Sequence, residues 1–442
     1  DRLRERVALA EGMGDDGTLA PEAKERALVA LSRFGERLKG MPPESIRAVG
    51  TNTFRKAHDE DFRHRAESNL GTRIDVIAGR EEARLIYLGV SHDIEDDGER
   101  RLLVDIGGGS TEYIVGEGFE TVATDSLHMG CVSYTDRFFA GGKISKRRFD
   151  EAQTAASLEL HSLESRFQAL GWERAIGSSG TITSVQAILE AQGWTKHDIT
   201  MKGLLKLRNH LVDAGHVDSV RLEGLQPERR AVLPGGVAIL LATFERLGIE
   251  RMTATTSALR EGLLHDLLGR IHHDDVRDDT VRRMADRYRL DTEQASRVES
   301  TALALYRKAK TGWEINEPDH PKMLRWAARL HEIGKSVAYS GHHKHGAYLI
   351  YHSDMPGFSR QDQIYLASLV GAHRRKLRPE LFRTTEDGRR ARRLCVILRL
   401  AILFNRNRDR REVPGVNLRV DGDRLELKFP KKWLADRPLM EA

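Results

Sequence analysis

Two apolar runs that enclose three consecutive glycines constrain the fold of this chain more than any other part of its sequence. Leu102–Ile106 has the composition of a buried strand, and Glu112–Val115 that of the strand returning from a hairpin. Asp105 lies where the first strand runs out, and the turn after it consists of Gly107, Gly108, Gly109 and Ser110. Since glycine has no Cβ, the N–H groups of such a turn can approach an anion closely. With the carboxylate beside it, the turn suits a phosphate and a divalent cation, or else it is a tight turn with a structural aspartate.

A second turn of small residues follows a later strand. The strand Arg174–Ile176 runs into Gly177, Ser178, Ser179, Gly180 and Thr181, and a helix is expected from Ile182. Free N–H groups, small side chains and the dipole of the helix favour an anion here. The turn lacks the lysine of a P-loop, so Walker-A chemistry is not indicated. Two interpretations remain, a phosphate-binding loop and an ordinary left-handed turn.

Two further strand ends carry candidate functional side chains. The strand Ile46–Gly50 is followed by Thr51–Arg55, whose hydroxyl, amide and guanidinium groups suit either an anion or simple capping of the next helix. The strand Ile74–Ala78 leads to Glu81 and Glu82, which open a helix. Acidic residues in a first turn are favoured by the helix dipole, but a carboxylate at such a junction can also act as a general base on water.

The remaining pattern divides the chain into an α/β part and a helical part. Residues 1–45 form an amphipathic helical segment, and residues 46–270 alternate strands, hairpins and helices, which predicts an α/β fold with two lobes and a cleft. Gly141–Arg148 is expected to be a flexible, basic connection. Helical patterns dominate from Asp278 to about Arg408, and Val416–Phe429 alternates like a hairpin.

Histidines gather in the helical part. His331 is expected on a helix beside Glu332, and further histidines are His342, His343, His345 and His352. His-rich stretches can bind metal, but metal binding needs a geometry that this spacing does not guarantee. Surface or interface histidines are therefore the preferred interpretation.

The composition, with 40% hydrophobic and 31% charged residues in 442 positions, is typical of a soluble globular protein. No apolar run of about 18 residues is long enough to span a membrane. Two cysteines, Cys131 and Cys395, exclude a disulfide scaffold or a cysteine-based zinc site and fit a reducing cytoplasm. The first residue is Asp1 rather than methionine, so the sequence leaves open whether a targeting segment precedes it.

Positive charge is concentrated in one segment. The net charge is +5, yet residues 371–411 contain 14 Lys or Arg against four Asp or Glu, a net of +10. Such a stripe indicates a polyanionic partner, namely nucleic acid, an acidic membrane surface or a phosphate polymer, unless it is a solvated helical face. Phe382 and Phe404 are the aromatic residues of the segment, which gives little support to base stacking and hence to nucleic acid.

Six motifs in this order resemble those of the exopolyphosphatase/guanosine pentaphosphate phosphohydrolase (Ppx/GppA) family: TNTFRKA, AGREEARLIYLGV, VDIGGGSTEYIVG, IGSSGTITS, LPGG and ALREGLL. The segments WAARLHEIG, SGHHKHGAYLI and HSDMPGF resemble the helical third domain of the long bacterial exopolyphosphatases. The resemblance implies a two-lobed actin/hexokinase/Hsp70-like (ribonuclease H-like) core, an all-α HD-like domain and a small β region. The expected domains are 1–86 and 87–273 for the two lobes, 274–411 for the helical domain and 412–442 for the start of the β region.

The resemblance also implies roles for individual residues. Glu82 matches a carboxylate that activates water, and Arg55 matches a basic residue that faces the phosphate. Asp105 and Glu112 match the acidic pair around phosphate and cation, and the turns 107–110 and 177–181 match phosphate-binding loops. Mg²⁺ is the implied cofactor, held by the acidic pair, with a monovalent cation as a further candidate.

The chain departs from the family pattern at three places. The opening phosphate loop of the family, of the type Asp-Leu/Ile-Gly-Ser-Asn-Ser, has no counterpart, so the first strands of the first lobe are expected to be missing. Thr255–Ala258 replaces a glycine-containing turn. Glu332 follows His331 where a true HD domain has aspartate, so no catalytic metal is expected in the helical domain.

The resulting hypothesis is an exopolyphosphatase that removes terminal orthophosphate from inorganic polyphosphate with a metal-assisted water activated by Glu82. The resemblance further implies a homodimer in the cytoplasm, with a peripheral place at the inner membrane as an alternative. The expected channel for the polymer is lined by Lys143, Lys146, Arg147, Arg148, His343, His345, Arg374 and Arg375. The alternatives are hydrolysis of guanosine pentaphosphate, with a link to guanosine tetraphosphate and the stringent response, and a non-catalytic regulator that binds polyphosphate or nucleotide.

Overall fold

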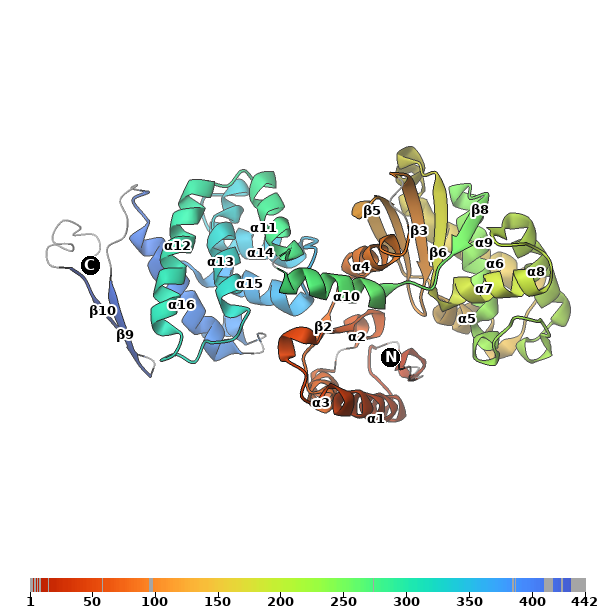
Figure 1. Cartoon of the computed structure of the whole chain (residues 1–442), viewed down its shortest axis with the longest axis horizontal. Coiled ribbons are helices and arrows are strands. Elements are labelled where there is room, and N and C mark those ends of the chain that lie inside the picture. The colour runs from red at the N-terminus through yellow and green to blue at the C-terminus, as the bar shows by residue number, and fades with distance from the viewer. Residues whose placement is uncertain are drawn as a thin grey trace. The chain divides into compact units, whose positions relative to one another are not determined.

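The structure is a computed structural model of the 442-residue chain, and it describes all residues except 1, 2, 4, 6, 8, 15, 58, 95–97, 273, 384, 386, 409–415, 423 and 431–442. The chain divides into two compact units, Asp1–Asp274 and Asp275–Ala442 (Figure 1). The first unit contains a small lobe, which ends before residue 79, and a larger lobe built on a six-stranded sheet.

The sheet of the larger lobe has the strand order β5-β4-β3-β6-β8-β7. Its strands are β3 Arg100–Ile106, β4 Thr111–Glu117, β5 Glu120–Leu127, β6 Arg174–Ser178, β7 Ile199–Thr200 and β8 Arg251–Ala254. The first three form an antiparallel meander, β6 runs parallel to β3, β8 runs parallel to β6, and β7 is antiparallel to β8. The hairpin predicted around the three glycines is confirmed.

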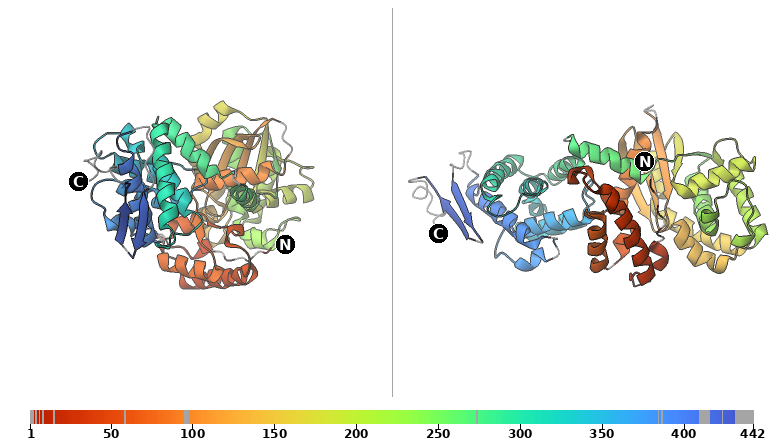
Figure 2. Two further views of the ribbon diagram at one scale, coloured as in Figure 1. Left: turned by 60° about the vertical axis from the view of Figure 1, so that its left-hand side comes forward. Right: turned by 60° about the horizontal axis from the view of Figure 1, so that its bottom comes forward.

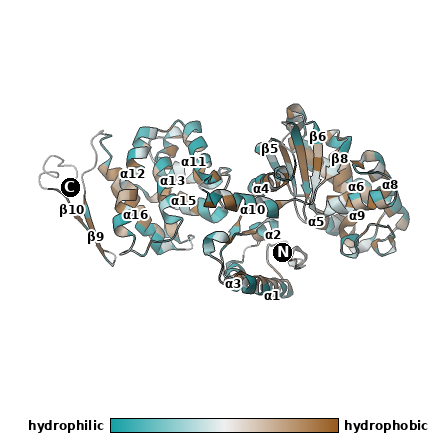
Figure 3. Ribbon diagram, in the orientation of Figure 1, coloured by the Kyte–Doolittle hydropathy of each residue, from teal (hydrophilic) through white to brown (hydrophobic). Residues whose placement is uncertain are grey.

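Helices cover both faces of this sheet (Figure 1). One face carries α5 Cys131–Phe138, α6 Lys146–Leu170, α7 Ser179–Ala191, α8 Met201–Ala214 and α9 Leu233–Leu247. The other face carries α4 Gly79–Ser91, against which α10 Leu259–Ile271 packs. Because both faces are covered, β3 and β4 are buried along nearly their whole length, and brown, hydrophobic segments mark the strands of this sheet in Figure 3.

The backbones of α4 and α10 approach each other through two glycines. A Cβ atom on Gly262 would stand 1.7 Å from the carbonyl oxygen of Leu85, and one on Gly89 would stand 2.4 Å from the carbonyl oxygen of Ala258. Only glycine, which has no Cβ, leaves room for these contacts. The two helices therefore form one closely packed pair.

The small lobe consists of α1 Pro21–Leu38, α2 Asn52–Lys56, α3 Glu60–Leu70 and the strands β1 Ala48–Gly50 and β2 Ile74–Val76. β1 and β2 pair in parallel, and α1 and α3 lie side by side (Figure 2). This lobe has its own apolar core, in which Leu28 and Phe62 are buried. β2 leads through two residues into α4, so the lobe boundary predicted at residue 86 falls inside a helix that packs on the larger lobe.

The second unit is helical apart from one hairpin. Its helices are α11 Val276–Arg287, α12 Thr292–Ala309, α13 His320–Leu330, α14 His342–His352, α15 Arg360–Ala372 and α16 Gly388–Phe404, and its strands β9 Asn417–Asp421 and β10 Arg424–Lys428 pair antiparallel. The predicted helical region and hairpin are confirmed. Within the predicted β region 412–442, residues 412–415, 423 and 431–442 lie outside the described residues. Among the helices described, none is long and apolar enough to cross a membrane.

Some local predictions are wrong. Gly141–Arg148 is not a flexible connection throughout, because α6 already begins at Lys146. The hydroxyl of Ser145 caps this helix by accepting a hydrogen bond of 3.3 Å from the backbone N–H of Arg148. His331 does not lie within a helix but follows the last residue of α13.

Replacing Gly262 with alanine should destabilise the first unit, because the new methyl group would collide with the backbone oxygen of Leu85. Overpacking of this kind typically costs about 1–3 kcal/mol and should lower the midpoint of urea unfolding. Gly269→Ala is the matched control on the same helix, since its Cβ would stand 3.1 Å from the nearest atom, the carbonyl oxygen of Asp274. Equal midpoints for the two variants would contradict the close packing of α4 against α10.

Candidate active site

A row of polar side chains crosses four neighbouring strands of the sheet. The register pairs Asp105 of β3 with Glu112 of β4 on one side and with Ser178 of β6 on the other. Glu112 in turn pairs with Ser126 of β5, whose hydroxyl donates a hydrogen bond of 2.9 Å to it. Directly opposed residues point to the same face, with Cβ atoms about 4.5–5.5 Å apart. The four side chains therefore lie side by side at one end of the sheet.

The row faces α4, which carries a third carboxylate. Leu103 packs into the apolar layer beneath α4, and Asp105 shares its face because it lies two residues further along the strand. Glu82 is in the first turn of α4, and its negative charge acts on both Asp105 and Glu112. Glu82, Asp105 and Glu112 are 8%, 7% and 1% exposed, respectively. They form one buried cluster, here called the carboxylate cluster.

Arg55 connects the small lobe to the carboxylate cluster. Its Nη1 donates a hydrogen bond of 2.7 Å to Oε2 of Glu82 and one of 2.9 Å to the carbonyl oxygen of Ile77. The hydroxyl of Thr51 also interacts with Glu82. Thr51 immediately precedes α2, which carries Arg55. The small lobe thus supplies a positive charge and a hydroxyl, and the larger lobe supplies the carboxylates.

Burial makes the clustered carboxylates difficult to ionise. It raises the pKa of Asp105 to about 6; the hydroxyl of Ser178 opposes this rise, and the charge of Glu82 adds to it. Burial, followed by the charges of Glu82 and Asp105, holds the pKa of Glu112 well above its ordinary value. Burial also raises the pKa of Glu82, although the guanidinium of Arg55 opposes the rise. Added positive charge would therefore stabilise the ionised cluster.

The two small-residue turns lie at the same edge of the sheet, because Asp105 and Ser178 are level across β3 and β6. The turn 107–110 follows β3, and the N–H of Gly107 donates a hydrogen bond of 2.9 Å to the carbonyl oxygen of Ser110. In the second turn, Gly177 and Ser178 belong to the end of β6, and Ser179–Thr181 form the start of α7, three residues earlier than predicted. The sequence thus foresaw two turns that the structure brings together with the carboxylate cluster, and their binding of phosphate stays a prediction.

Two polar side chains lie against these turns. A Cβ atom on Gly109 would stand 2.0 Å from Nδ2 of Asn52, and one on Gly180 would stand 1.9 Å from Nη2 of Arg229. The sequence prediction missed Arg229, which belongs to a short 3₁₀ helix, Pro227–Val232, distant in sequence from both turns. The sequence offered one indication of a functional role, since Arg229 and Arg230 are consecutive arginines shortly before the LPGG segment.

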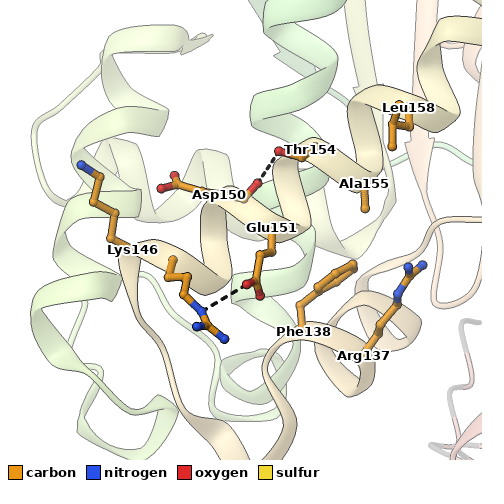
Figure 4. Close-up of a pocket in the computed structure, with 9 residues that line it drawn as sticks. Arg137, Phe138, Lys146, Asp150, Glu151, Thr154, Ala155 and Leu158 are labelled. Carbon is orange, nitrogen blue, oxygen red and sulfur yellow. Dashed lines mark hydrogen bonds and ion pairs between the residues drawn. The ribbon is translucent and has the colours of Figure 1, made fainter.

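Four of the residues predicted to line a polymer channel lie on or just before α6. Arg148 donates hydrogen bonds to backbone carbonyls of the preceding loop, the shortest at 3.2 Å, and Lys143 is exposed. Lys146 and Arg147 line a surface groove of about 750 Å³, where Arg147 pairs with Glu151 at 3.1 Å (Figure 4). No member of the carboxylate cluster lines this groove.

The other four channel residues lie in the second unit. Arg375 is exposed and His345 is half-buried, whereas Arg374 approaches a group of buried histidines. This group consists of His331, His342, His343 and His373, with neighbouring ring centroids 5.5–6.2 Å apart. His331, His342 and His343 are at most 8% exposed, so the expectation of surface histidines is wrong for these three.

A divalent cation fits the donor set of the carboxylate cluster. Mg²⁺ prefers oxygen ligands and is commonly held by one or two carboxylates together with waters and substrate phosphates. Asp105 and Glu112 are adjacent oxygen donors whose pKa values burial raises. In the part of the chain that the structure describes, no three His, Cys, Asp or Glu side chains are arranged to hold a metal ion. A cation held by Asp105 and Glu112 would therefore need ligands from a phosphate or from water.

Two family models together match nearly the whole chain. The model described as the Ppx/GppA phosphatase family matches residues 1–271, and that described as Ppx/GppA phosphatase, domain III, matches residues 276–442. The chain is 40% identical over 441 residues to the guanosine-5′-triphosphate,3′-diphosphate pyrophosphatase of Aeromonas hydrophila, which covers 99% of this chain and 88% of that protein. It is 38% identical over 439 residues to the protein of the same name from Photobacterium profundum, with the same coverage.

Solved structures are also similar to the chain. The crystal structure of an exopolyphosphatase-like protein has a TM-score of 0.54 at 25% identity and covers 60% of this chain and 90% of that one. The crystal structure of an exopolyphosphatase from Cytophaga hutchinsonii has a TM-score of 0.53 at 24% identity and covers 59% of this chain and 87% of that one. The second likeness is one of fold alone.

Replacing Asp105 with asparagine should raise the thermal stability of the ligand-free protein above pH 6. Folding raises the pKa of this carboxyl from 3.8 to about 6, so the folded state binds more protons between these values and stability falls as the pH rises through them. The neutral amide avoids this cost, which is on the order of 3 kcal/mol.

Calorimetry at pH 4 and pH 8 checks this expectation, with Asp213→Asn, at an exposed position of α8, as the control. The gain from Asp105→Asn should be present at pH 8 and nearly absent at pH 4. An equal change in unfolding temperature at pH 4 and at pH 8 would show that the substitution does not act by removing the ionisation of Asp105.

Proposed function

The chain belongs to the Ppx/GppA phosphatase family and is a hydrolase of phosphoanhydride bonds, and we propose that its preferred substrate is guanosine 5′-triphosphate 3′-diphosphate. In this proposal the enzyme releases the terminal phosphate of the 5′ chain as orthophosphate. The observation that carries the proposal is the buried cluster of Glu82, Asp105 and Glu112 beside two small-residue turns. The choice of nucleotide is supported by relatives named for it, which are 38–40% identical over 99–100% of this chain.

The fold is the two-lobed, actin-like one that the sequence resemblance implied, followed by a helical domain and a hairpin. It supplies two kinds of group that the reaction needs. A phosphoanhydride resists hydrolysis because its negative charges repel a nucleophile, so catalysis requires donors for the charged oxygens and a water aligned with the leaving group.

The donors in this proposal come from the two small-residue turns and the side chains against them. The N–H groups of 108–110 and 179–181, the amide of Asn52 and the guanidinium of Arg229 are the proposed donors next to the carboxylate cluster. Donors of this kind act on the charge that develops in the transition state, and removal of one typically costs about 10²–10³ in rate. The turns are fixed by the sheet, so little reorganisation is needed when the substrate binds.

Glu82 is the proposed general base, which orients the attacking water and accepts its proton. Burial raises the pKa of this carboxyl toward the working pH, where a general base is most effective. Arg55 opposes the rise through its ion pair of 2.7 Å with Glu82.

Asp105 and Glu112 are the proposed ligands of Mg²⁺. The bound ion would supply positive charge to the transferred phosphoryl group. The two carboxylates are held by opposed positions of β3 and β4, and Ser126 orients Glu112 through its hydrogen bond of 2.9 Å. Because both carboxylates lie next to the turn 107–110, the bound ion and the backbone N–H donors would act on the same phosphate.

Inorganic polyphosphate is the second candidate substrate, because it presents the same terminal bond. The likeness to the crystal structure of an exopolyphosphatase-like protein, at 25% identity, favours it. Lys146 and Arg147, which line the surface groove beside α6, would contribute only to the binding of a long polyanion. The substitution of both residues by alanine therefore separates the two candidates, since it should weaken hydrolysis of polymer and leave that of nucleotide unchanged.

Glu82→Gln should lower the release of orthophosphate from guanosine 5′-triphosphate 3′-diphosphate by about 10²–10⁴-fold, the usual contribution of a general base. The loss should lie in kcat, since glutamine keeps the shape of the site. Glu190→Gln, at an exposed position of α7, is the control. Phosphate release is measured with both the nucleotide and polyphosphate, and equal rates for Glu82→Gln and the parent would remove Glu82 from the mechanism.

Mg²⁺ should raise the unfolding temperature more at pH 8 than at pH 5, because the cation binds ionised carboxylates and the pKa values of Asp105 and Glu112 are raised. The shift should be lost in Asp105→Asn and in Glu112→Gln and kept in Asp213→Asn. Differential scanning fluorimetry without substrate measures it. A shift that survives both substitutions would place the cation elsewhere.

A further inference from the structure

We propose that Arg47 and Asp266 form a latch between the two lobes of the first unit and thereby position Arg55 against Glu82. Both act as positioning residues, since neither belongs to the carboxylate cluster. The inference rests on the proposed role of Glu82 in hydrolysis. It adds an explanation of how Arg55 is held in its ion pair with Glu82.

Asp266 of α10 is the large-lobe half of the latch. Its side chain is 3% exposed and receives three guanidinium groups. Arg84 of α4 donates to Oδ1 at 2.5 Å, Arg270 of α10 donates to Oδ2 at 2.9 Å, and Arg47 of the small lobe donates to Oδ2 as well. Burial alone would raise the pKa of Asp266, but the three positive charges outweigh burial and hold it well below its ordinary value. The carboxylate therefore stays ionised, and its hydrogen bonds are the strong, charge-assisted kind.

The same network fixes the first turn of α4, where Glu82 stands. Arg84 forms two hydrogen bonds of 2.8 Å with Glu81, the residue next to Glu82. Close packing of α4 against α10 through Gly89 and Gly262 prevents the two helices from shifting relative to each other. Asp266 and Glu82 therefore move as parts of one rigid element.

Arg47 is the small-lobe half of the latch. It directly precedes β1, and its side chain is 6% exposed. Only Ala48–Gly50 separates it from Thr51, and α2, which carries Arg55, follows at once. β1 is paired in register with β2, which limits bending of this segment. A displacement of Arg47 from Asp266 would therefore be transmitted to Thr51 and Arg55.

Stability alone is a weak explanation for this buried charge network. Replacing buried ion pairs by apolar side chains of similar volume is often neutral or stabilising, because desolvation offsets the attraction between the charges. An ion pair between two lobes is directional, unlike an apolar contact. Its hydrogen bonds and its charges therefore favour one relative orientation of the lobes. The network of Arg47, Arg84 and Arg270 around one carboxylate suits that role.

Loss of the latch has a specific chemical consequence. The groups that face Glu82 are Arg55 and Thr51 from the small lobe and the carboxylates Asp105 and Glu112 from the sheet. If Arg55 is no longer held, its hydrogen bond of 2.7 Å to Glu82 is lost and the orientation of this carboxylate with it. The loss should appear in kcat, because a misplaced catalytic group slows the chemical step.

The kinetic test compares Arg47→Met with Arg270→Met. Both remove one guanidinium from Asp266, but Arg270 lies on the same helix as Asp266 and pairs with it within α10, whereas Arg47 comes from the small lobe. Arg47→Met should lower kcat on guanosine 5′-triphosphate 3′-diphosphate by about 10- to 100-fold, as misplacement of a catalytic group does. Arg270→Met should lose similar stability and keep kcat, and Arg47→Lys should restore part of the rate. Equal effects of Arg47→Met and Arg270→Met on kcat, or no rescue by Arg47→Lys, would overturn the proposal.

A second measurement needs no turnover and therefore separates failure of the latch from failure of the proposed function. Pulsed electron paramagnetic resonance measures the distance between the lobes, with one spin label on Val29→Cys of α1 and one on Leu158→Cys of α6. These positions are 44% and 73% exposed, respectively. The native cysteines Cys131 and Cys395 are buried. The parent and Arg270→Met should give one narrow distance distribution, and Arg47→Met a broader or shifted one.

If Arg47→Met does not fold, Arg47→Gln takes its place in both measurements. A distance distribution that Arg47→Met or Arg47→Gln leaves unchanged would overturn the latch, whichever substrate the enzyme hydrolyses. A changed distribution in a protein that releases no phosphate from nucleotide or polymer would support the latch and count against the proposed function.

Discussion

The register of three adjacent strands, which sets Asp105 between Glu112 and Ser178, is the constraint on which the rest of the site depends. A shift of one residue along β3 would turn Asp105 to the opposite face of the sheet, into the apolar layer beneath α5 to α9. The covered sheet fixes that register, because β3 and β4 are buried on both faces along nearly their whole length. The packing of apolar side chains thus holds the carboxylate cluster in a buried position, where ionisation of its carboxyl groups is unfavourable.

The two lobes divide the charges of the site between them. The larger lobe contributes carboxylates on the sheet and on α4, and the small lobe contributes Arg55 through a short helix. The ion pair between Arg55 and Glu82 joins the two contributions, so the relative orientation of the lobes decides whether the site is complete.

Local features were predictable from the sequence, and long-range pairings were not. The three glycines after β3 and the small residues after β6 identified both turns, because a turn of this kind is encoded by adjacent residues. The motif order identified the family, and the comparisons support it. The contacts of Arg229 with the second turn and of Arg47 with Asp266 join residues far apart in the chain, and no local pattern encodes them. Burial of His342 and His343 was missed for the same reason, since the packing of α14 against α15 decides it.

The most direct test of the account is a double-mutant cycle between Glu82→Gln and Glu112→Gln, read as the free energy of unfolding at pH 8 without metal or substrate. If both carboxylates belong to one charged cluster, each single substitution relieves the same repulsion, so the double variant gains less stability than the sum of the singles. The account predicts a shortfall of at least about 0.5 kcal/mol, which should vanish at pH 4, where the carboxyls are protonated. Strict additivity at pH 8 would show that Glu82 and Glu112 do not share a site.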